Sequence, residues 1–248
     1  FPGTIQDIHR HRRHSSQKGA PLANSRPLFA LLVGINEYDP ECGVPSLRGC
    51  VNDVRAMEHM LADSFGVPAD NILTLVDSEA TAAAIQNGFQ SHLVQNAARW
   101  SEQGAAQGMD APAFLFYFSG HGSQARDLSG IEPDGMDETL VAHDSRTPGV
   151  FDIRDWELGE WIAQLNAITE EVTVILDCCH SGSGTRDDEE LPCSRACPPD
   201  LRAAPWRRPA SARAQLQRSL SPSNWETGAG HVLLAACRDR EIAREHAL

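Results

Sequence analysis

The sequence predicts an α/β fold in which a mostly parallel central sheet is covered by helices on both faces, a three-layer α/β/α sandwich. Short apolar runs alternate with longer stretches of helical periodicity from residue 28 onward. Several of these runs are apolar throughout, which is typical of strands buried on both faces. With 41% hydrophobic residues in 248, the chain can bury one sizeable core.

Strands and helices are expected to alternate in chain order. The run LFALLVGI, starting at Leu28, predicts the first strand. NDVRAMEHMLADSF predicts a helix, because Val54, Met57 and Leu61 share one face. Further strands are expected at NILTLV (71–76), PAFLFYF (112–118), VTVIL (172–176) and HVLLAA (231–236), and further helices across residues 85–100 and 158–165. The acidic stretch before the last helix is expected to be a loop.

Stretches without periodicity divide the chain. Residues 1–27 are expected to form a flexible N-terminal arm, and residues 28–183 the main folded region. Residues 184–228, rich in arginine and proline, are interpreted as a flexible linker. Residues 229–248 begin a further part of the fold, which we expect to continue beyond Leu248.

Charge and composition restrict the partners. A net charge of −13 disfavours binding to nucleic acid or to an anionic membrane surface, since both would repel the chain. The sequence also has no run of about 18 apolar residues, as a membrane-spanning helix requires. An acidic site that binds a cationic substrate fits this charge better. Seven cysteines without regular spacing favour a reducing compartment. We expect the cytoplasm, with the nucleus as a second location.

Two predicted strands end in residues that carry chemistry. YFSGHGSQ places His121 between glycines, and ILDCCHSG ends in Cys178 and Cys179. The carboxyl ends of parallel strands meet at one edge of a sheet, so His121 can face a cysteine. A thiol with an ordinary pKa of about 8.5 needs such a base to act as a nucleophile at neutral pH. A glycine such as Gly122 lets a backbone N–H approach a developing oxyanion.

Other interpretations of these residues remain at this point. Either cysteine can be a buried structural thiol, and this is the favoured interpretation of Cys178. His180 is a second possible base, although consecutive residues leaving a strand point in different directions. A cysteine phosphatase requires arginine six positions after the nucleophile, and Arg186 lies one position too far from Cys179. The first strand is not followed by the glycine pattern of dinucleotide-binding folds.

The two motifs, 58 residues apart, resemble those of the metacaspases, caspase-like cysteine peptidases of family C14, and the fungal type in particular. LLVGINEY, LRGCVNDV and GHVLLAACRDREIARE extend the resemblance. It implies a caspase-like fold, with residues 28–183 as the large subunit and 229–248 as the start of the small one. It further implies that Cys179 is the nucleophile, that His121 is the general base and acid, and that the N–H groups of Gly122 and Cys179 form the oxyanion hole.

The same resemblance implies a monomeric endopeptidase that cleaves after Arg or Lys and that is made as a zymogen. Its acidic S1 pocket would consist of Cys50, Asp53, Ser119 and Asp177. Two carboxylates that repel each other in an empty pocket are both satisfied by one guanidinium. Self-processing is expected between Arg186 and Arg218, within the linker.

The resemblance also raises calcium as a possible activator, bound by Asp137, Asp155 and either Asp187 or Asp188. Carboxylate oxygens suit calcium. Trp156 stands where the family usually has a second aspartate, so calcium dependence is left open. The alternative to an enzyme is an inactive caspase-like regulator or scaffold. Such relatives usually lack the cysteine or the histidine, whereas this chain has both.

Overall fold

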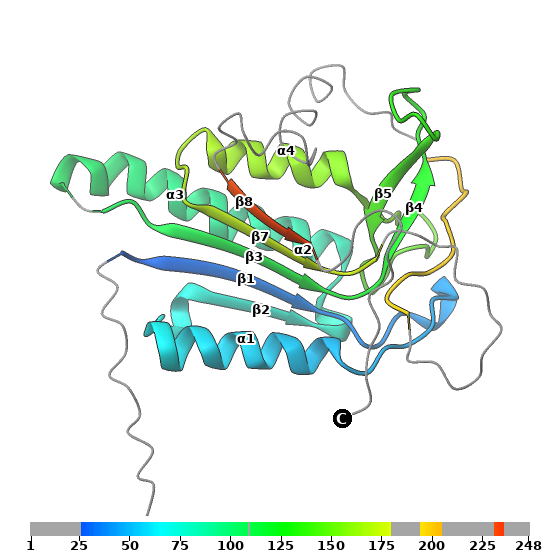
Figure 1. The fold of residues 1–248 in the computed structure, drawn as a ribbon, viewed down its shortest axis with the longest axis horizontal. Coiled ribbons are helices and arrows are strands. Elements are labelled where there is room, and N and C mark those ends of the chain that lie inside the picture. Colours follow the sequence, from blue (N-terminus) through cyan, green and yellow to red (C-terminus); the bar gives the residue numbers. More distant parts are fainter. Residues whose placement is uncertain (1–25, 109, 180–193, 205–230, 236–248) are drawn as a thin grey trace, which may run out of the picture.

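The computed structural model describes residues 26–108, 110–179, 194–204 and 231–235. Its centre is a five-stranded sheet in the order β2-β1-β3-β7-β8, in which all neighbouring strands are parallel (Figure 1). The strands are β1 (Leu28–Gly34), β2 (Ile72–Val76), β3 (Ala113–Ser119), β7 (Val172–Asp177) and β8 (His231–Ala235). The predicted α/β architecture with a mostly parallel sheet is therefore confirmed.

Helices cover both faces of this sheet. Figure 1 shows α1 (Cys50–Phe65) on one side and α4 (Asp155–Asn166) on the other. The predicted long helix is built from α2 (Ala82–Gly88), α3 (Gln95–Arg99) and two π-helical stretches, Phe89–Val94 and Trp100–Gly104. Short 3₁₀ turns lie at Pro40–Cys42, Ala69–Asn71, Asp77–Glu79 and Ala105–Gln107. Among the described residues, no helix has the length and apolarity needed to cross a membrane.

Alternating strand residues supply two hydrophobic cores. Leu32 of β1 packs on the α1 side with Val54 and Leu61. Val33, the next residue of β1, belongs to the larger core on the other side, as does Phe116 of β3. The apolar runs in the sequence therefore reflect burial on both faces, as expected for the central strands of a parallel sheet.

A second, antiparallel sheet follows β3 and was not predicted. It consists of β4 (Gly122–Arg126), β5 (Met136–Leu140) and β6 (Ile153–Arg154). The loop expected here from the acidic sequence was wrong. These strands are short and carry polar residues that become buried, Ser123 and Thr139 among them, so they lack the apolar pattern of the central sheet.

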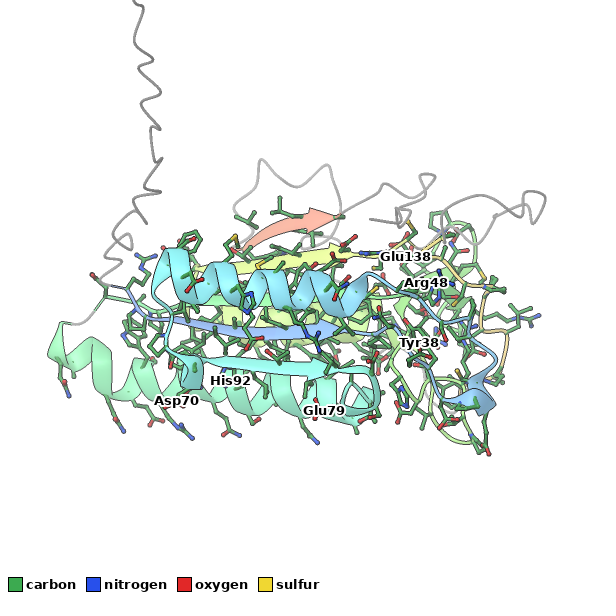
Figure 2. The ribbon with its side chains drawn as sticks, turned by 90° about the horizontal axis from the view of Figure 1, so that it is seen from below. Tyr38, Arg48, Asp70, Glu79, His92 and Glu138 are labelled. Atoms are coloured by element: carbon green, nitrogen blue, oxygen red, sulfur yellow. The ribbon has the colours of Figure 1, made fainter. Side chains whose placement is uncertain are left out.

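The carboxyl ends of the central strands lie in one register. Ser119 at the end of β3 is paired with Gly34 of β1 on one side and with Asp177 of β7 on the other. Figure 2 shows Tyr38 at this end of the sheet. Arg48 and Glu138 lie at the same end, whereas Asp70 lies at the opposite end. The residues that follow β1, β3 and β7 are thereby gathered at one edge.

Part of the predicted linker is packed against this edge. Residues 194–204 lie beside β4, with isolated parallel bridges from Gly122 to Ala196 and from Ala125 to Asp200. Cys197, to which the sequence pattern assigned no role, is 2% exposed. This stretch thus has a defined position, which the arginine and proline content of residues 184–228 did not indicate.

Candidate active site

His121 is fixed through its backbone and its ring. It follows β3 by two residues and is 1% exposed. Its backbone N–H donates to the Tyr38 hydroxyl over 2.8 Å, and its carbonyl accepts from the Val141 N–H over 3.0 Å. The imidazole Nε2 lies 2.9 Å from the Pro45 carbonyl oxygen. Because a carbonyl only accepts, Nε2 carries the proton in the neutral ring, and Nδ1 is then the basic nitrogen.

Tyr38 supports this arrangement from the loop after β1. Its ring centroid lies 5.2 Å from that of His121. Burial raises the pKa of the Tyr38 phenol well above its usual range, so the hydroxyl stays neutral at working pH. Gly120 makes the close approach possible, because a Cβ there would lie 2.9 Å from the Phe118 ring and 3.2 Å from the Tyr38 oxygen.

Cys179 lies at the equivalent position of the neighbouring strand. It follows β7 by two residues, as His121 follows β3, and β3 and β7 are paired directly. It is fully buried, as is Cys178, which belongs to the larger hydrophobic core. The backbone N–H of Cys179 points at the carbonyl oxygen of Arg195 over 3.3 Å, and the N–H of Gly122 donates to the same oxygen over 2.9 Å.

The four residues expected to form an acidic pocket come together around one side chain. The Arg195 guanidinium donates through Nη2 to the Asp53 carboxylate over 2.6 Å, and its Nη1 pairs with the Asp177 carboxylate. Nη1 also donates to the Ser119 hydroxyl over 3.0 Å. Cys50, the first residue of α1, is fully buried. One guanidinium thus meets two carboxylates and a hydroxyl, as a cationic substrate group would.

Electrostatics favour the charged form of this arginine. Burial alone lowers the pKa of Arg195, but the adjacent Cys50, Asp53 and Asp177 more than compensate and raise it above its ordinary value. The side chain of Arg195 is only 8% exposed, whereas those of Asp53 and Asp177 are 38% and 29% exposed. The pocket therefore encloses the guanidinium and keeps its own carboxylates in contact with solvent.

Sequence reasoning missed three contributors to this site. Arg195 was noted only as one linker arginine among seven, and Pro45 and Tyr38 received no role. Arg195 is separated in sequence from Asp53 by 142 residues and from Ser119 by 76, so no local sequence pattern predicts these contacts. The one available signal was chemical: an arginine-rich segment in a chain that also has an acidic pocket.

Of the residues proposed for calcium, Asp137 and Asp155 lie within the described part of the chain. The carboxylate of Asp137, in β5, is paired with the buried guanidinium of Arg154. Asp155 begins α4 and accepts from the Trp156 N–H over 2.7 Å, while Asp187 lies outside the described residues. No three His, Cys, Asp or Glu residues in the described part of the chain form a metal-binding group. The Arg154 guanidinium therefore already neutralises Asp137, and calcium binding by this chain stays a prediction.

Comparison with known proteins identifies the family. Residues 29–186 match the family model described as the metacaspase, peptidase C14 domain. The chain belongs to the metacaspases. The predicted resemblance is thus confirmed, and with it membership of a family of cysteine peptidases.

Curated metacaspases of fungi and plants are similar to the same region. Metacaspase-1 of Eremothecium gossypii is 33% identical over 154 residues, which cover 62% of this chain and 32% of the relative. Metacaspase-3 of Arabidopsis thaliana is 32% identical, over 62% of this chain and 40% of the relative. The matched region therefore spans between about a third and two fifths of the length of these relatives.

A solved structure shares the fold. Protein GSU0716 from Geobacter sulfurreducens aligns with a TM-score of 0.51 and 23% identity, covering 89% of this metacaspase and 76% of that chain. At this identity the likeness concerns the fold alone. It agrees with the sheet and helix layers seen here.

Proposed function

We propose that this metacaspase is a cysteine endopeptidase that cleaves peptide bonds after arginine or lysine and that is made as a precursor able to cut its own linker. The observation that carries the proposal is the position of Arg195. Its guanidinium lies between Asp53 and Asp177, while its carbonyl oxygen receives hydrogen bonds from two backbone N–H groups. A residue bound in this way resembles the arginine of a substrate just before the cleaved bond.

The two N–H groups are suited to stabilise the transition state. When a nucleophile attacks the carbonyl carbon, negative charge develops on the oxygen that Gly122 and Cys179 already contact. Such donors typically contribute about 3 kcal/mol each. They are backbone groups held by β4 and by the end of β7, so they need no rearrangement during the reaction.

The proposed reaction has two halves. In the first, the Cys179 thiol gives its proton to His121 and its sulfur bonds to the carbonyl carbon. The C–N bond of the peptide then breaks, and the imidazolium protonates the departing amine, leaving a thioester. In the second half, water adds to the thioester with His121 as base. The products are a free carboxylate and the restored thiol.

The ring contact of His121 supports this role. The hydrogen bond from Nε2 to Pro45 keeps the ring in one orientation and favours the tautomer in which Nδ1 is basic. The contact also remains available when the ring is doubly protonated, because the carbonyl can accept from either form. A single orientation thus serves both proton transfers.

The test uses fluorogenic peptides that differ only in the residue before the reporter. The wild-type chain should release the reporter after Arg or Lys but not after Asp, and Cys179→Ala should abolish release. Cys178→Ala is the matched control, because this neighbouring thiol lies in the hydrophobic core and should be dispensable for chemistry. Equal loss in both variants, or preference for Asp, would contradict the proposal. Absence of any cleavage would instead favour an inactive scaffold.

A further inference from the structure

The chain beyond Arg195 lies along β4 as an added strand. Residues 196–202, here called the primed segment, follow the bond between Arg195 and Ala196 on its carboxyl side. The N–H of Cys197 donates to the Gly122 carbonyl over 3.1 Å, and the N–H of Asp200 donates to the Gln124 carbonyl over 2.8 Å. Such strand addition gives affinity through the main chain and leaves selectivity to side-chain contacts.

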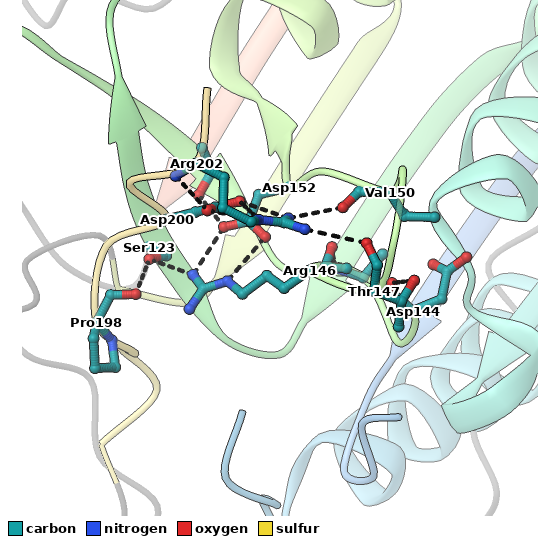
Figure 3. Close-up of polar contacts among 12 residues, drawn as sticks. Ser123, Asp144, Arg146, Thr147, Val150, Asp152, Pro198, Asp200 and Arg202 are labelled. Carbon is teal, nitrogen blue, oxygen red and sulfur yellow. Dashed lines mark hydrogen bonds and ion pairs between the residues drawn. The ribbon is translucent and has the colours of Figure 1, made fainter. Parts of the chain in front are cut away.

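Ser123 provides the first of those contacts. Its hydroxyl lies 3.1 Å from the Cys197 carbonyl and 2.9 Å from the Pro198 carbonyl (Figure 3). Arg146 donates to the same hydroxyl over 2.8 Å and is itself held by the Asp152 carboxylate, over 2.9 Å from Nη2. Because Arg146 can only donate, the serine hydrogen is free to bond a carbonyl of the primed segment.

A small residue is required two positions after the bond. The Cys197 side chain belongs to the larger hydrophobic core, together with Tyr38 and Leu140, and is 2% exposed. Burial raises the pKa of this thiol to about 11, so it stays protonated and behaves as a compact apolar group. A larger side chain would have to displace packed neighbours of the catalytic histidine.

Asp200 and Arg202 fasten the far end of the primed segment. The Arg202 guanidinium donates to the Asp200 carboxylate, from Nε over 3.0 Å and from Nη2 over 2.8 Å (Figure 3). It also donates to two backbone carbonyls, from Nη1 to Thr147 over 3.1 Å and from Nη2 to Val150 over 2.8 Å. Its guanidinium carbon also lies 4.7 Å from the centre of the Phe151 ring. Asp200 is 6% exposed, and although burial opposes ionisation, Arg202 keeps its pKa below the ordinary value.

Only one arginine of the linker is followed by the aspartate and the arginine that hold the primed segment. All seven arginines between residues 184 and 228 could present a guanidinium to the acidic pocket. Arg195 alone is followed by an aspartate five positions later and an arginine seven positions later. The pocket therefore cannot distinguish among these arginines, whereas contacts beyond the bond can.

We propose that Ser123, the Arg146–Asp152 pair and the carbonyls of Thr147 and Val150 form a primed-side binding groove that selects the Arg195–Ala196 bond for self-processing. The groove accepts an extended peptide with a small residue at the second position after the cleaved bond and an aspartate–arginine pair at the fifth and seventh. This inference rests on the proposed function, because it names the preferred substrate of the same site. The cleavage breaks the Arg195 C–Ala196 N bond and consumes one water, giving a carboxylate on Arg195 and an amine on Ala196.

The experiment follows self-processing of the full chain as it is made by cell-free translation. Fragments are identified by mass spectrometry, and the decay of the intact chain gives a rate. Wild type should give a fragment that begins at Ala196. Arg202→Ala should slow its appearance at least tenfold or shift cleavage to other arginines, and Arg202→Lys should rescue it only partly, since lysine lacks the planar fork. Arg207→Ala, which removes another linker arginine, is the control and should leave the rate unchanged.

A second readout separates this inference from the proposed function. A short peptide that ends in Arg followed by a reporter has no residues to place in the groove, so its cleavage per molecule of processed enzyme should be at least as fast for Arg202→Ala as for wild type. If this peptide is cleaved but no fragment begins at Ala196, or if Arg202→Ala and wild type process equally fast, the groove proposal is wrong and the proposed function stands. If neither the chain nor the peptide is cleaved, the proposed function itself fails.

Discussion

In the proposed function Asp53 and Asp177 bind the substrate's cationic group, since both contact one guanidinium, from α1 and from the end of β7 respectively. Asp53→Asn or Asp177→Asn removes one charge-assisted contact, which is worth about 1.5–3 kcal/mol. The kcat/KM for peptides with Arg before the cleaved bond should fall by about 10- to 100-fold. Asp63→Asn, at an exposed position of the same helix α1, is the matched control. An equal fall for Asp63→Asn would show that the effect is not specific to the pocket.

Tyr38 holds the backbone of His121, the proposed catalytic base, and this gives a second prediction. Tyr38→Phe keeps the ring but leaves the buried His121 N–H without its 2.8 Å acceptor. An orphaned buried donor costs about 1–3 kcal/mol. Chemical unfolding, measured in a Cys179→Ala background to prevent self-cleavage, should show this loss. Unchanged stability would mean that water or another group replaces the hydroxyl.

The loop between β4 and β5 is held by a single carboxylate. Asp127 accepts from the N–H groups of Ser129, Ile131 and Glu132 and from the Ser129 hydroxyl. Burial opposes ionisation, but these hydrogen bonds prevail and lower the Asp127 pKa to about 2 from an ordinary 3.8. The lowered pKa means that the unfolded chain binds the proton more readily, so this contribution to stability falls as the solution becomes more acidic.

The corresponding prediction concerns pH. The contribution of Asp127 should be complete above about pH 5 and disappear as the pH falls through 4 toward 2. Unfolding midpoints of Cys179→Ala and of the double variant with Asp127→Asn should therefore differ at neutral pH and converge near pH 2. A difference that stays constant with pH would show that the charge of Asp127 is not what stabilises the loop.

Individual elements were predictable where burial leaves a continuous apolar pattern. The strands β1, β3 and β7 have it, and the motifs at the ends of β3 and β7 were enough to predict that His121 and Cys179 share one edge of the sheet. The strands β4, β5 and β6 do not, because many of their buried residues are polar and form hydrogen bonds or ion pairs with partners on other segments. Ser123, for example, meets Pro198, 75 residues away. Pairings of this kind depend on the tertiary fold rather than on local sequence.

The resemblance was enough to expect Asp53, Ser119 and Asp177 close together, but it did not indicate the side chain that lies between them. That side chain, Arg195, lies in a stretch whose composition suggested only a linker. Its position depends on the primed segment, whose anchors are again long-range. Composition therefore predicts how a segment behaves on its own, but it does not predict the conformation that the segment takes when it packs against the folded protein.

At the scale of the whole molecule, the Arg195–Ala196 bond and the proposed catalytic residues Cys179 and His121 belong to one chain. Self-cleavage should therefore follow first-order kinetics with a rate independent of protein concentration. A Cys179→Ala chain mixed with wild type should be cut much more slowly. Its Arg195 and primed segment already occupy its own site, so they are poorly accessible to the site of a wild-type molecule. A rate that rises in proportion to concentration would instead indicate cleavage between molecules.

Calcium gives the last prediction. Binding through Asp137 would have to displace the buried Arg154 guanidinium, which is costly because it leaves a charge unpaired. Processing in the presence of a chelator should therefore stay within about twofold of the rate with added calcium. A tenfold or larger activation by calcium would show that residues outside the described part, Asp187 among them, bind the ion in another way.

The position of Arg195 also determines what happens after the cut. The new carboxyl terminus remains attached to Cys179 through only the 15 intervening residues, 180–194, and its guanidinium remains complementary to the pocket. A product tethered by so short a chain has a local concentration of the order of millimolar. If the proposed self-processing occurs, the cut chain carries its own competitive inhibitor, and removal of the terminal arginine by a carboxypeptidase should raise the turnover of other substrates.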